Sequence, residues 1–160
     1  MLNFFKKKNK PIKIKSPIMG TALPLSEVPD EVFASKMMGD GVAFEPTEGI
    51  LYAPMDGEVI QVFPTMHAVG IKSNHGLEIL LHIGIDTVNL SGEGFKSFIG
   101  VGDKVIVGQK LISFNIDFIK ENAKSAITPL IITNMDKVEK MEYTYGATTK
   151  DSVVLTVSIA

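Results

Sequence analysis

The chain alternates short apolar runs with turn-forming residues along most of its length. Runs rich in Val, Ile and Leu are separated by Gly, Pro, Asn and Asp, which is typical of many short strands. Helical content is expected to be small, with a turn or two at 29–33 and a short helix at 117–124. So many short strands need a sandwich or barrel, so we predict an all-β fold: a compact antiparallel β-sandwich or barrel-like domain with minimal short helix. The predicted strands are 41–44, 49–52, 57–63, 67–72, 77–85, 104–107, 110–115, 130–133 and 152–159.

Two histidines, His67 and His82, flank a turn at residues 73–76. If the flanking runs pair about the Asn74–His75 bond, paired residue numbers sum to 149 and the two histidines lie directly opposite each other. Opposed residues share a sheet face with Cβ atoms about 4.5–5.5 Å apart, so both imidazoles would reach one small anion. We predict this register and a phosphoryl-transfer site.

Turn chemistry alone does not choose the register. A three-residue loop ending at Gly76, with a bulge, gives a sum of 150 and places the two histidines on opposite faces of the sheet. Each histidine taken singly also fits a half-buried strand residue with a satisfied hydrogen bond. His75 is interpreted as a solvated turn residue.

Composition narrows the class of protein. With 160 residues, 45% of them apolar, the chain can bury one substantial core, and its length favours a single domain. Cysteine is absent, which excludes disulfides and thiolate chemistry and fits a reducing compartment, so we expect a cytoplasmic protein. No apolar run approaches the ~20 residues that span a bilayer, and no signal peptide is recognisable.

Charge is unevenly distributed. All sixteen basic residues are lysine, so any bidentate guanidinium must come from a partner. Six lysines and no acids lie in residues 1–15, which leaves ten lysines against eighteen acids, or 10 − 18 = −8, in the remainder. An acidic body argues against nucleic-acid binding and favours basic protein partners.

Residues 1–15 are predicted to be a basic N-terminal tail that precedes a domain at 16–160. Leu2, Phe4 and Phe5 come before the lysine cluster, a combination that suits weak contact with an anionic membrane surface. A solvated, mobile extension fits the same composition.

Two segments, 53–60 and 101–111, resemble stretches of biotinyl and lipoyl carrier domains, where a lysine on a tight turn carries the prosthetic group. No Met-Lys-Met or Asp-Lys-Ala hairpin lies between them; Thr65-Met66-His67 stands there instead. A prosthetic-group carrier is therefore the alternative hypothesis. The sequence contains no P-loop and no Gly-x-Ser-x-Gly elbow.

Longer motifs resemble one family closely. The glucose-type enzyme IIA of the bacterial sugar phosphotransferase system is similar from about Ser16 to Ile159, on runs at 32–34, 39–41, 65–68, 82–88, 92–95 and 128–135. The resemblance implies an antiparallel β-sandwich that accepts a phosphoryl group from the histidine phosphocarrier HPr and passes it to a cysteine on the IIB domain of a sugar permease. It also suggests regulation, in which phosphorylation state decides which transporters or metabolic enzymes are bound.

The resemblance assigns roles residue by residue. His82 matches the phosphorylated histidine, His67 its companion, and Thr65 the threonine that orients the companion. Met66 replaces a residue that is often asparagine in the family, and Asn89 replaces a commonly acidic one. Methionines suit a surface that accepts several partners, although they also fit a partly buried position. Partner contacts are implied at Val32, Phe33, Met37, Met38, Phe63, Gly84 and Asp86.

No obligatory cofactor is expected. A neutral imidazole is a nucleophile that also leaves easily, and a second imidazole can donate a hydrogen bond to the phosphoryl oxygens. The same two side chains, His67 and His82, would bind Zn²⁺ only if a partner contributed a carboxylate, because two ligands are too few for a closed site.

Overall fold

The computed structural model describes residues 10–160. The chain in this range forms short antiparallel strands, two short α-helices and three single-turn 3-10 helices. The strands are β1 (Ile12–Lys15), β2 (Gly20–Pro24), β3 (Asp40–Pro46), β4 (Ile50–Tyr52), β5 (Gly57–Val62), β6 (Ala68–Ser73), β7 (Glu78–His82), β8 (Phe95–Ser97), β9 (Lys104–Val105), β10 (Lys110–Phe114), β11 (Thr128–Ile132), β12 (Val138–Tyr143), β13 (Gly146–Thr148) and β14 (Val153–Ile159). The helices are η2 (Leu25–Glu27), α1 (Glu31–Ala34), η3 (Thr87–Leu90), α2 (Ile116–Asn122) and η4 (Met135–Lys137). This confirms the all-β prediction.

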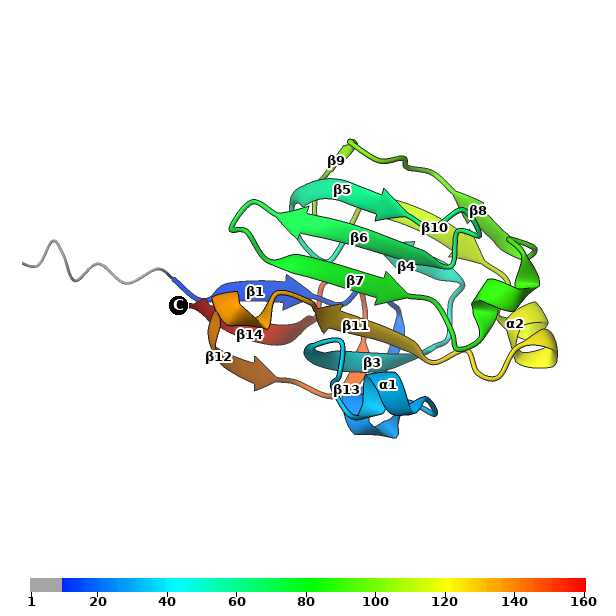
Figure 1. Cartoon of the computed structure of the whole chain (residues 1–160), viewed down its shortest axis with the longest axis horizontal. Helices are drawn as coiled ribbons and strands as arrows, with labels where there is room; N and C mark the ends of the chain where they lie inside the picture. Colours follow the sequence, from blue (N-terminus) through cyan, green and yellow to red (C-terminus); the bar gives the residue numbers. More distant parts are fainter. Residues whose placement is uncertain (1–9) are drawn as a thin grey trace, which may run out of the picture.

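Three sheets make up the sandwich (Figure 1). The largest has eight strands in the order β13-β2-β3-β11-β7-β6-β5-β9. Two three-stranded sheets, β1-β14-β12 and β4-β10-β8, complete the fold. The main core contains side chains from all three sheets, including Ile14 of β1, Leu51 of β4 and Leu81 of β7, which are each 0% exposed.

The two faces of the large sheet have different neighbours. Successive strand residues point to opposite faces, and in β7 the side chains of Ile79 and Leu81 enter the main core whereas Leu80 does not. Leu80 belongs to a second, smaller cluster with Ala43 and Ile131 from neighbouring strands. We call this side the outer face of the sheet.

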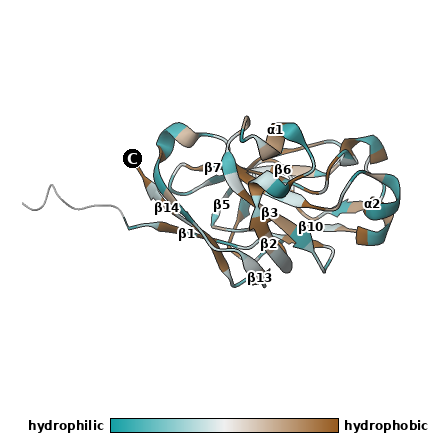
Figure 2. Ribbon diagram, turned by 90° about the horizontal axis from the view of Figure 1, so that it is seen from below, coloured by the Kyte–Doolittle hydropathy of each residue, from teal (hydrophilic) through white to brown (hydrophobic). Residues whose placement is uncertain are grey.

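Helices η2 and α1 cover part of the outer face. They and the segment between them contribute Leu25, Val28 and Phe33 to the smaller cluster. Helix α1 is only one turn long, and it begins where the Asp30 carboxylate accepts a hydrogen bond from the Val32 amide at 2.9 Å. In Figure 2 α1 has a hydrophilic and a hydrophobic part. The outer face therefore has its own small apolar layer.

The predicted register of the β6–β7 hairpin is wrong. Ala68 pairs with His82 and Lys72 with Glu78, so paired numbers sum to 150. The loop has three residues and ends at Gly76, whose φ of +93° is accessible to glycine but strained for other residues. Asn134 braces it: its side chain donates to the Gly76 carbonyl at 2.9 Å and accepts from the Glu78 amide at 2.8 Å.

The boundary predicted between tail and domain also differs from the structure. Residues 12–15 form β1, which pairs with β14, and Ile12 and Ile14 are buried in the main core. The tail was predicted from the many lysines in residues 1–15. The alternation of Ile and Lys at 12–15 is instead that of an amphipathic strand. The predicted membrane contact and mobility of the tail concern Leu2, Phe4 and Phe5, which lie outside the described residues.

All nine predicted strands are present with shifted ends, and most are shorter than predicted. The prediction missed β1, β2, β8, β12 and β13, which are short or rich in polar residues; all of them except β2 are edge strands. The helix predicted at 117–124 is α2, and the turn predicted at 29–33 contains the start of α1. Between residues 10 and 160 no helix is long and apolar enough to cross a membrane.

Candidate functional site

His82 is the last residue of β7 and lies on the outer face, because it follows Leu80 by two positions. Its Nδ1 is 2.7 Å from the carbonyl oxygen of Gly84. A carbonyl only accepts hydrogen bonds, so Nδ1 carries the proton of the ring. In the neutral ring the lone pair is then on Nε2, which is the nitrogen available for chemistry.

Gly84 is at a position that other residues would fit poorly. Its φ is +72°, and a Cβ placed there would lie 2.6 Å from Thr87 Cγ2 and 2.8 Å from the Ser125 carbonyl oxygen. Thr87 is itself held, because its hydroxyl donates to the Ile83 carbonyl at 2.6 Å. The carbonyl that orients His82 is therefore fixed by a tightly packed turn.

His67 precedes β6 in a bend instead of forming part of the strand. Regular continuation of β6 would have turned its ring toward the main core, since Ala68 is on the outer face. Met66 just before it has a left-handed φ of +60°, and this bend turns the chain out of strand geometry. The His67 carbonyl still accepts the Ile83 amide at 2.7 Å, so the ends of β6 and β7 remain joined.

The two imidazoles meet in this arrangement. Their ring centroids are 4.9 Å apart, with an angle of 80° between the planes. The register differs from the prediction, yet the rings share one face because the bend at His67 compensates. Two phenylalanines flank the pair: Phe33 lies 5.0 Å from His82 and Phe63 5.2 Å from His67, between centroids.

Thr65 holds the second ring. Its Oγ1 is 2.6 Å from Nδ1 of His67, a contact in which either atom can donate. The residue lies in the same bend and not on a regular strand, so its role follows from the local turn. If the hydroxyl donates, the proton of the His67 ring is on Nε2, and that nitrogen becomes a hydrogen-bond donor.

Both histidines are neutral near pH 7. The pKa of His67 is lowered to about 4, because burial disfavours the charged ring and because His82 lies beside it. Burial also lowers the pKa of His82; the Gly84 carbonyl and the carboxylates of Asp30 and Asp86 oppose that shift. His67 is 2% exposed whereas His82 is more accessible, so a reactant would reach His82 first.

The other residues implied in partner contact divide into two groups. Val32, Met37 and Met38 are 40%, 73% and 41% exposed and lie on or just after α1. Asp86 is also exposed, with a left-handed φ of +63°. Phe33, Phe63 and Gly84 are buried or partly buried and instead form the walls of the histidine site.

Two residues that the sequence analysis did not select belong near the site. Asp30 caps α1 and its charge acts on His82. The signal was available, because an Asp before a short helical segment is a usual N-cap. Val88, in η3 two residues after Asp86, is an exposed apolar residue with 51% of its surface accessible.

The described part of the chain contains no group of three or more metal-ligating side chains. The histidine pair itself offers two nitrogens. His67 would have to move its proton to Nδ1, and donate it to Thr65, before Nε2 could bind a metal.

Comparison with known proteins identifies the class. The family model described as phosphoenolpyruvate-dependent sugar phosphotransferase system, EIIA 1, matches residues 12–138, and the chain belongs to this family. It is therefore a phosphocarrier component of a sugar phosphotransferase system. The family match favours the phosphocarrier hypothesis over the alternative of a prosthetic-group carrier.

Individual relatives are glucose-specific components. The PTS system glucose-specific EIIA component of Bacillus anthracis is 51% identical over 135 residues, covering 84% of this chain and 82% of that protein. The EIICBA component of Staphylococcus saprophyticus is 55% identical over 125 residues, covering 78% of this chain and 18% of that protein. Glucose permease IIA from Mycoplasma capricolum has a TM-score of 0.86 and 39% identity, covering 97% of this chain and 99% of that one.

Proposed function

We propose that His82 accepts a phosphoryl group from phospho-HPr and passes it to the IIB domain of a sugar permease. One observation carries the assignment: two neutral imidazoles lie 4.9 Å apart, and each Nδ1 is already engaged by a neighbour. Both Nε2 atoms are left for the phosphoryl group. The family membership supports the two partners.

The first transfer needs a free lone pair. The lone pair on His82 Nε2 attacks phosphorus, the bond between phosphorus and the donor's histidine nitrogen breaks, and its electrons return to that nitrogen. In the second transfer a thiolate of the IIB domain attacks phosphorus and the P–Nε2 bond breaks. Because the lowered pKa keeps His82 neutral, no proton has to leave before the first step.

His67 stabilises the phosphoryl group without bonding to it. With the Thr65 hydroxyl donating to Nδ1, the Nε2–H of His67 is the donor for a phosphoryl oxygen. Burial holds the ring in place, since His67 is 2% exposed and packs edge-on against Phe63. The apolar walls also exclude water that would hydrolyse the phosphohistidine.

The exposed strip beside the site is the proposed docking face. Val32, Met37 and Met38 supply an apolar surface that repacks readily, and Asp30 and Asp86 add negative charge close to His82. Basic groups of the partners would complement these acids. A guanidinium at this interface would have to come from the partner, because this chain has no arginine. The same face would let regulated transporters or enzymes distinguish the phosphorylated from the free form.

Zn²⁺ is proposed only as a bridge to a partner. His67 and His82 supply two imidazole ligands, and a carboxylate of the partner would supply the third. Bound there, zinc would join the two proteins and block the nucleophile. Tight zinc binding by the free protein is not expected.

Glutamine substitutions separate the two histidine roles. His82→Gln removes the nucleophile and is expected to accept no phosphoryl group, because an amide nitrogen does not attack phosphorus at a useful rate. His67→Gln keeps the nucleophile and an N–H donor, so acceptance from phospho-HPr is retained. Onward transfer is expected to slow by about 10²–10³, the usual effect of a misplaced donor in a transition state.

The measurement is single-turnover transfer of labelled phosphate from HPr and then to a IIB acceptor. His75→Gln is the matched control, because this third histidine lies in the turn at the other end of β7. Labelling of His82→Gln together with loss of labelling in His67→Gln would reverse the assigned roles.

A further inference from the structure

Three adjoining hollows follow β1 at the end of the molecule away from His67 and His82. The first, of about 410 Å³, is lined by Lys10, Lys13, Lys15, Met55 and Val107, among others. A second, of about 400 Å³, shares Lys15 and Val107 with it and extends to Lys150. A third, of about 360 Å³, shares Lys10 and Ile12. We call these hollows together the β1 groove.

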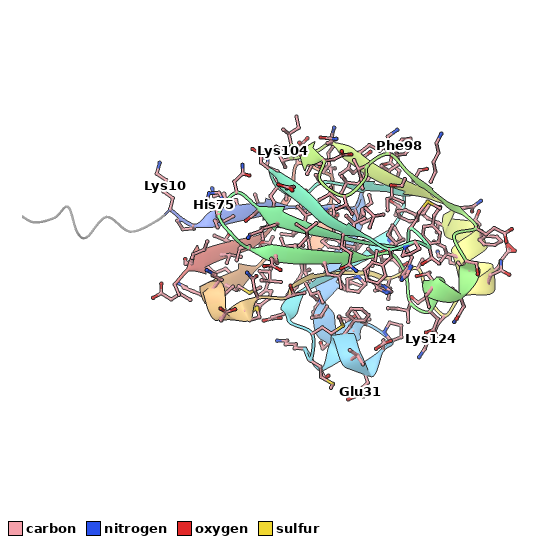
Figure 3. The ribbon with its side chains drawn as sticks, turned by 45° about the horizontal axis from the view of Figure 1, so that its top comes forward. Lys10, Glu31, His75, Phe98, Lys104 and Lys124 are labelled. Atoms are coloured by element: carbon pink, nitrogen blue, oxygen red, sulfur yellow. The ribbon has the colours of Figure 1, made fainter. Side chains whose placement is uncertain are left out.

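The β1 groove is remote from the proposed docking face. Figure 3 shows Lys10 and His75 at one end of the molecule and Lys124 at the other. The Lys124 amide donates to the carbonyl of Ile85, three residues after His82, so Lys124 marks the histidine end. A partner in the groove would leave His82 accessible.

The groove is cationic in an otherwise acidic body. Four lysines, at 10, 13, 15 and 150, line it against two acids, Asp56 and Asp151. Asp56 is already engaged, since its Oδ1 accepts from the Val107 amide at 2.8 Å. Among residues 10–160, none of the three ion pairs involves these lysines. Lys150 lies over the Tyr52 ring, 5.4 Å from its centroid, so the charges available to an anionic partner are chiefly those of Lys10, Lys13 and Lys15.

The groove also has an apolar component. Ile106 and Val107 are 67% and 40% exposed on its rim, and Met55 and Ile12 form part of its floor. Lysine ammonium groups beside exposed aliphatic side chains suit a ligand with alternating acidic and apolar groups. β1 is an edge strand of its sheet; the Lys15 amide already donates to the Pro54 carbonyl at 2.9 Å, so an extended segment would lie along the N-terminal part of β1, beside Lys13.

We propose that the β1 groove binds an extended acidic segment of a partner protein, with Asp or Glu at the lysines and an apolar side chain against Ile106 and Val107. A concave, partly apolar site fits a single chain better than the plane of a membrane surface. The proposal goes beyond the phosphoryl-transfer function and does not depend on it.

The test uses the full chain and dye-labelled peptides in which Glu or Asp alternates with Leu or Ile. Saturable binding at low salt is expected by fluorescence anisotropy. Matched peptides with Gln in place of the acids, or Gly in place of the apolar residues, are expected to bind at least tenfold more weakly. Amide NMR shifts should move at Lys13, Lys15 and Val107 and stay unchanged at His67 and His82.

Charge reversal provides the control. Lys13→Glu with Lys15→Glu is expected to weaken binding at least tenfold, whereas Lys96→Glu with Lys120→Glu changes the same charge elsewhere and leaves binding intact. Ile106→Ser, at an exposed position, tests the apolar part without changing charge. Phosphoryl acceptance from HPr should persist in all of these variants. Three outcomes would overturn the proposal. The first is equal binding of peptides with and without apolar residues. The others are binding only to phosphatidylglycerol vesicles and self-association of the protein.

Discussion

The two imidazoles of the site are the same chemical group in different hydrogen-bonding positions. The Gly84 carbonyl can only accept, so it fixes the proton of His82 on Nδ1. The Thr65 hydroxyl can donate, so it permits His67 to keep its proton on Nε2. One ring is thereby suited to attack and the other to donate. Residue types alone pointed to both histidines, but a tautomer depends on the neighbour that each ring contacts.

Burial of His67 has a consequence for stability below neutral pH. Its pKa is about 4 in the folded protein and ~6.5 in an unfolded chain. Between these values the unfolded state binds a proton that the folded state does not, so the free energy of unfolding falls as pH drops from 6.5 to 4. The expected loss is up to about 3 kcal/mol at about 1.4 kcal/mol per pKa unit.

Denaturant unfolding at a series of pH values measures this dependence. His67→Gln lacks the titrating group and is expected to lose correspondingly less stability over the same interval. The comparison between the two proteins removes the contribution of carboxylates, which both share. Identical pH slopes would contradict the lowered pKa.

Gly84 is expected to tolerate alanine poorly. A Cβ would clash with the Ser125 carbonyl and with Thr87, and the residue would be left at a φ of +72°. A left-handed non-glycine residue alone costs about 1–3 kcal/mol, and relief of the clash would move the carbonyl that orients His82. Gly84→Ala should therefore lower both the unfolding free energy and the rate of phosphoryl acceptance.

Gly102→Ala is the matched control for this substitution. Gly102 has a φ of +94°, but no atom lies within 4 Å of the place that a Cβ would take, so alanine there carries the backbone strain without the clash. It should lower stability and leave the phosphorylation rate unchanged. Equal effects of both variants on the phosphorylation rate would remove the positioning role of Gly84.

At the level of elements, the two strands of the β6–β7 hairpin could be predicted from the sequence, but their register could not. Alternating apolar residues indicated both strands, but the register depended on whether Gly76 would adopt a left-handed conformation. Asn134, 58 residues away, braces that loop, and no local pattern reveals such a contact. The bend at Met66 and His67 was equally hidden, because it breaks strand geometry inside an apolar run. The histidine pair was therefore predicted from the wrong register, and the partner-contact residues rested on family resemblance.

Asn134→Ala is expected to destabilise this hairpin. Its side chain satisfies the Gly76 carbonyl and the Glu78 amide beside the turn, and each hydrogen bond is worth about 0.5–1.5 kcal/mol. The unfolding free energy should fall by about 1–3 kcal/mol, with faster amide exchange at the turn. Asn74→Ala, in the exposed loop itself, is the control and should have little effect. Unchanged amide exchange at Gly76 and Glu78 in Asn134→Ala would show that the register is set within the loop alone.

For the whole molecule, the two faces of the large sheet have different roles. Its inner face packs against the two small sheets, so it supplies most of the buried apolar area. Its outer face has only a thin cover from η2 and α1, and His82 stays partly exposed there. A deep core on one side thus permits a partly open, water-poor site on the other.

The first strand completes that core and gives the last prediction. Ile12 and Ile14 are 7% and 0% exposed, and they pack on β14 opposite Val157 and Leu155. Losing a buried Ile side chain typically costs about 2–5 kcal/mol, so removing both approaches the whole stability of a small domain. A chain that lacks residues 1–15 should therefore be largely unfolded or several kcal/mol less stable than one that lacks only residues 1–9. Denaturant unfolding of the two truncations measures the contribution of the segment at 10–15. Equal stabilities would mean that β1 is dispensable and that the domain begins where the lysine-rich composition first suggested, at Ser16.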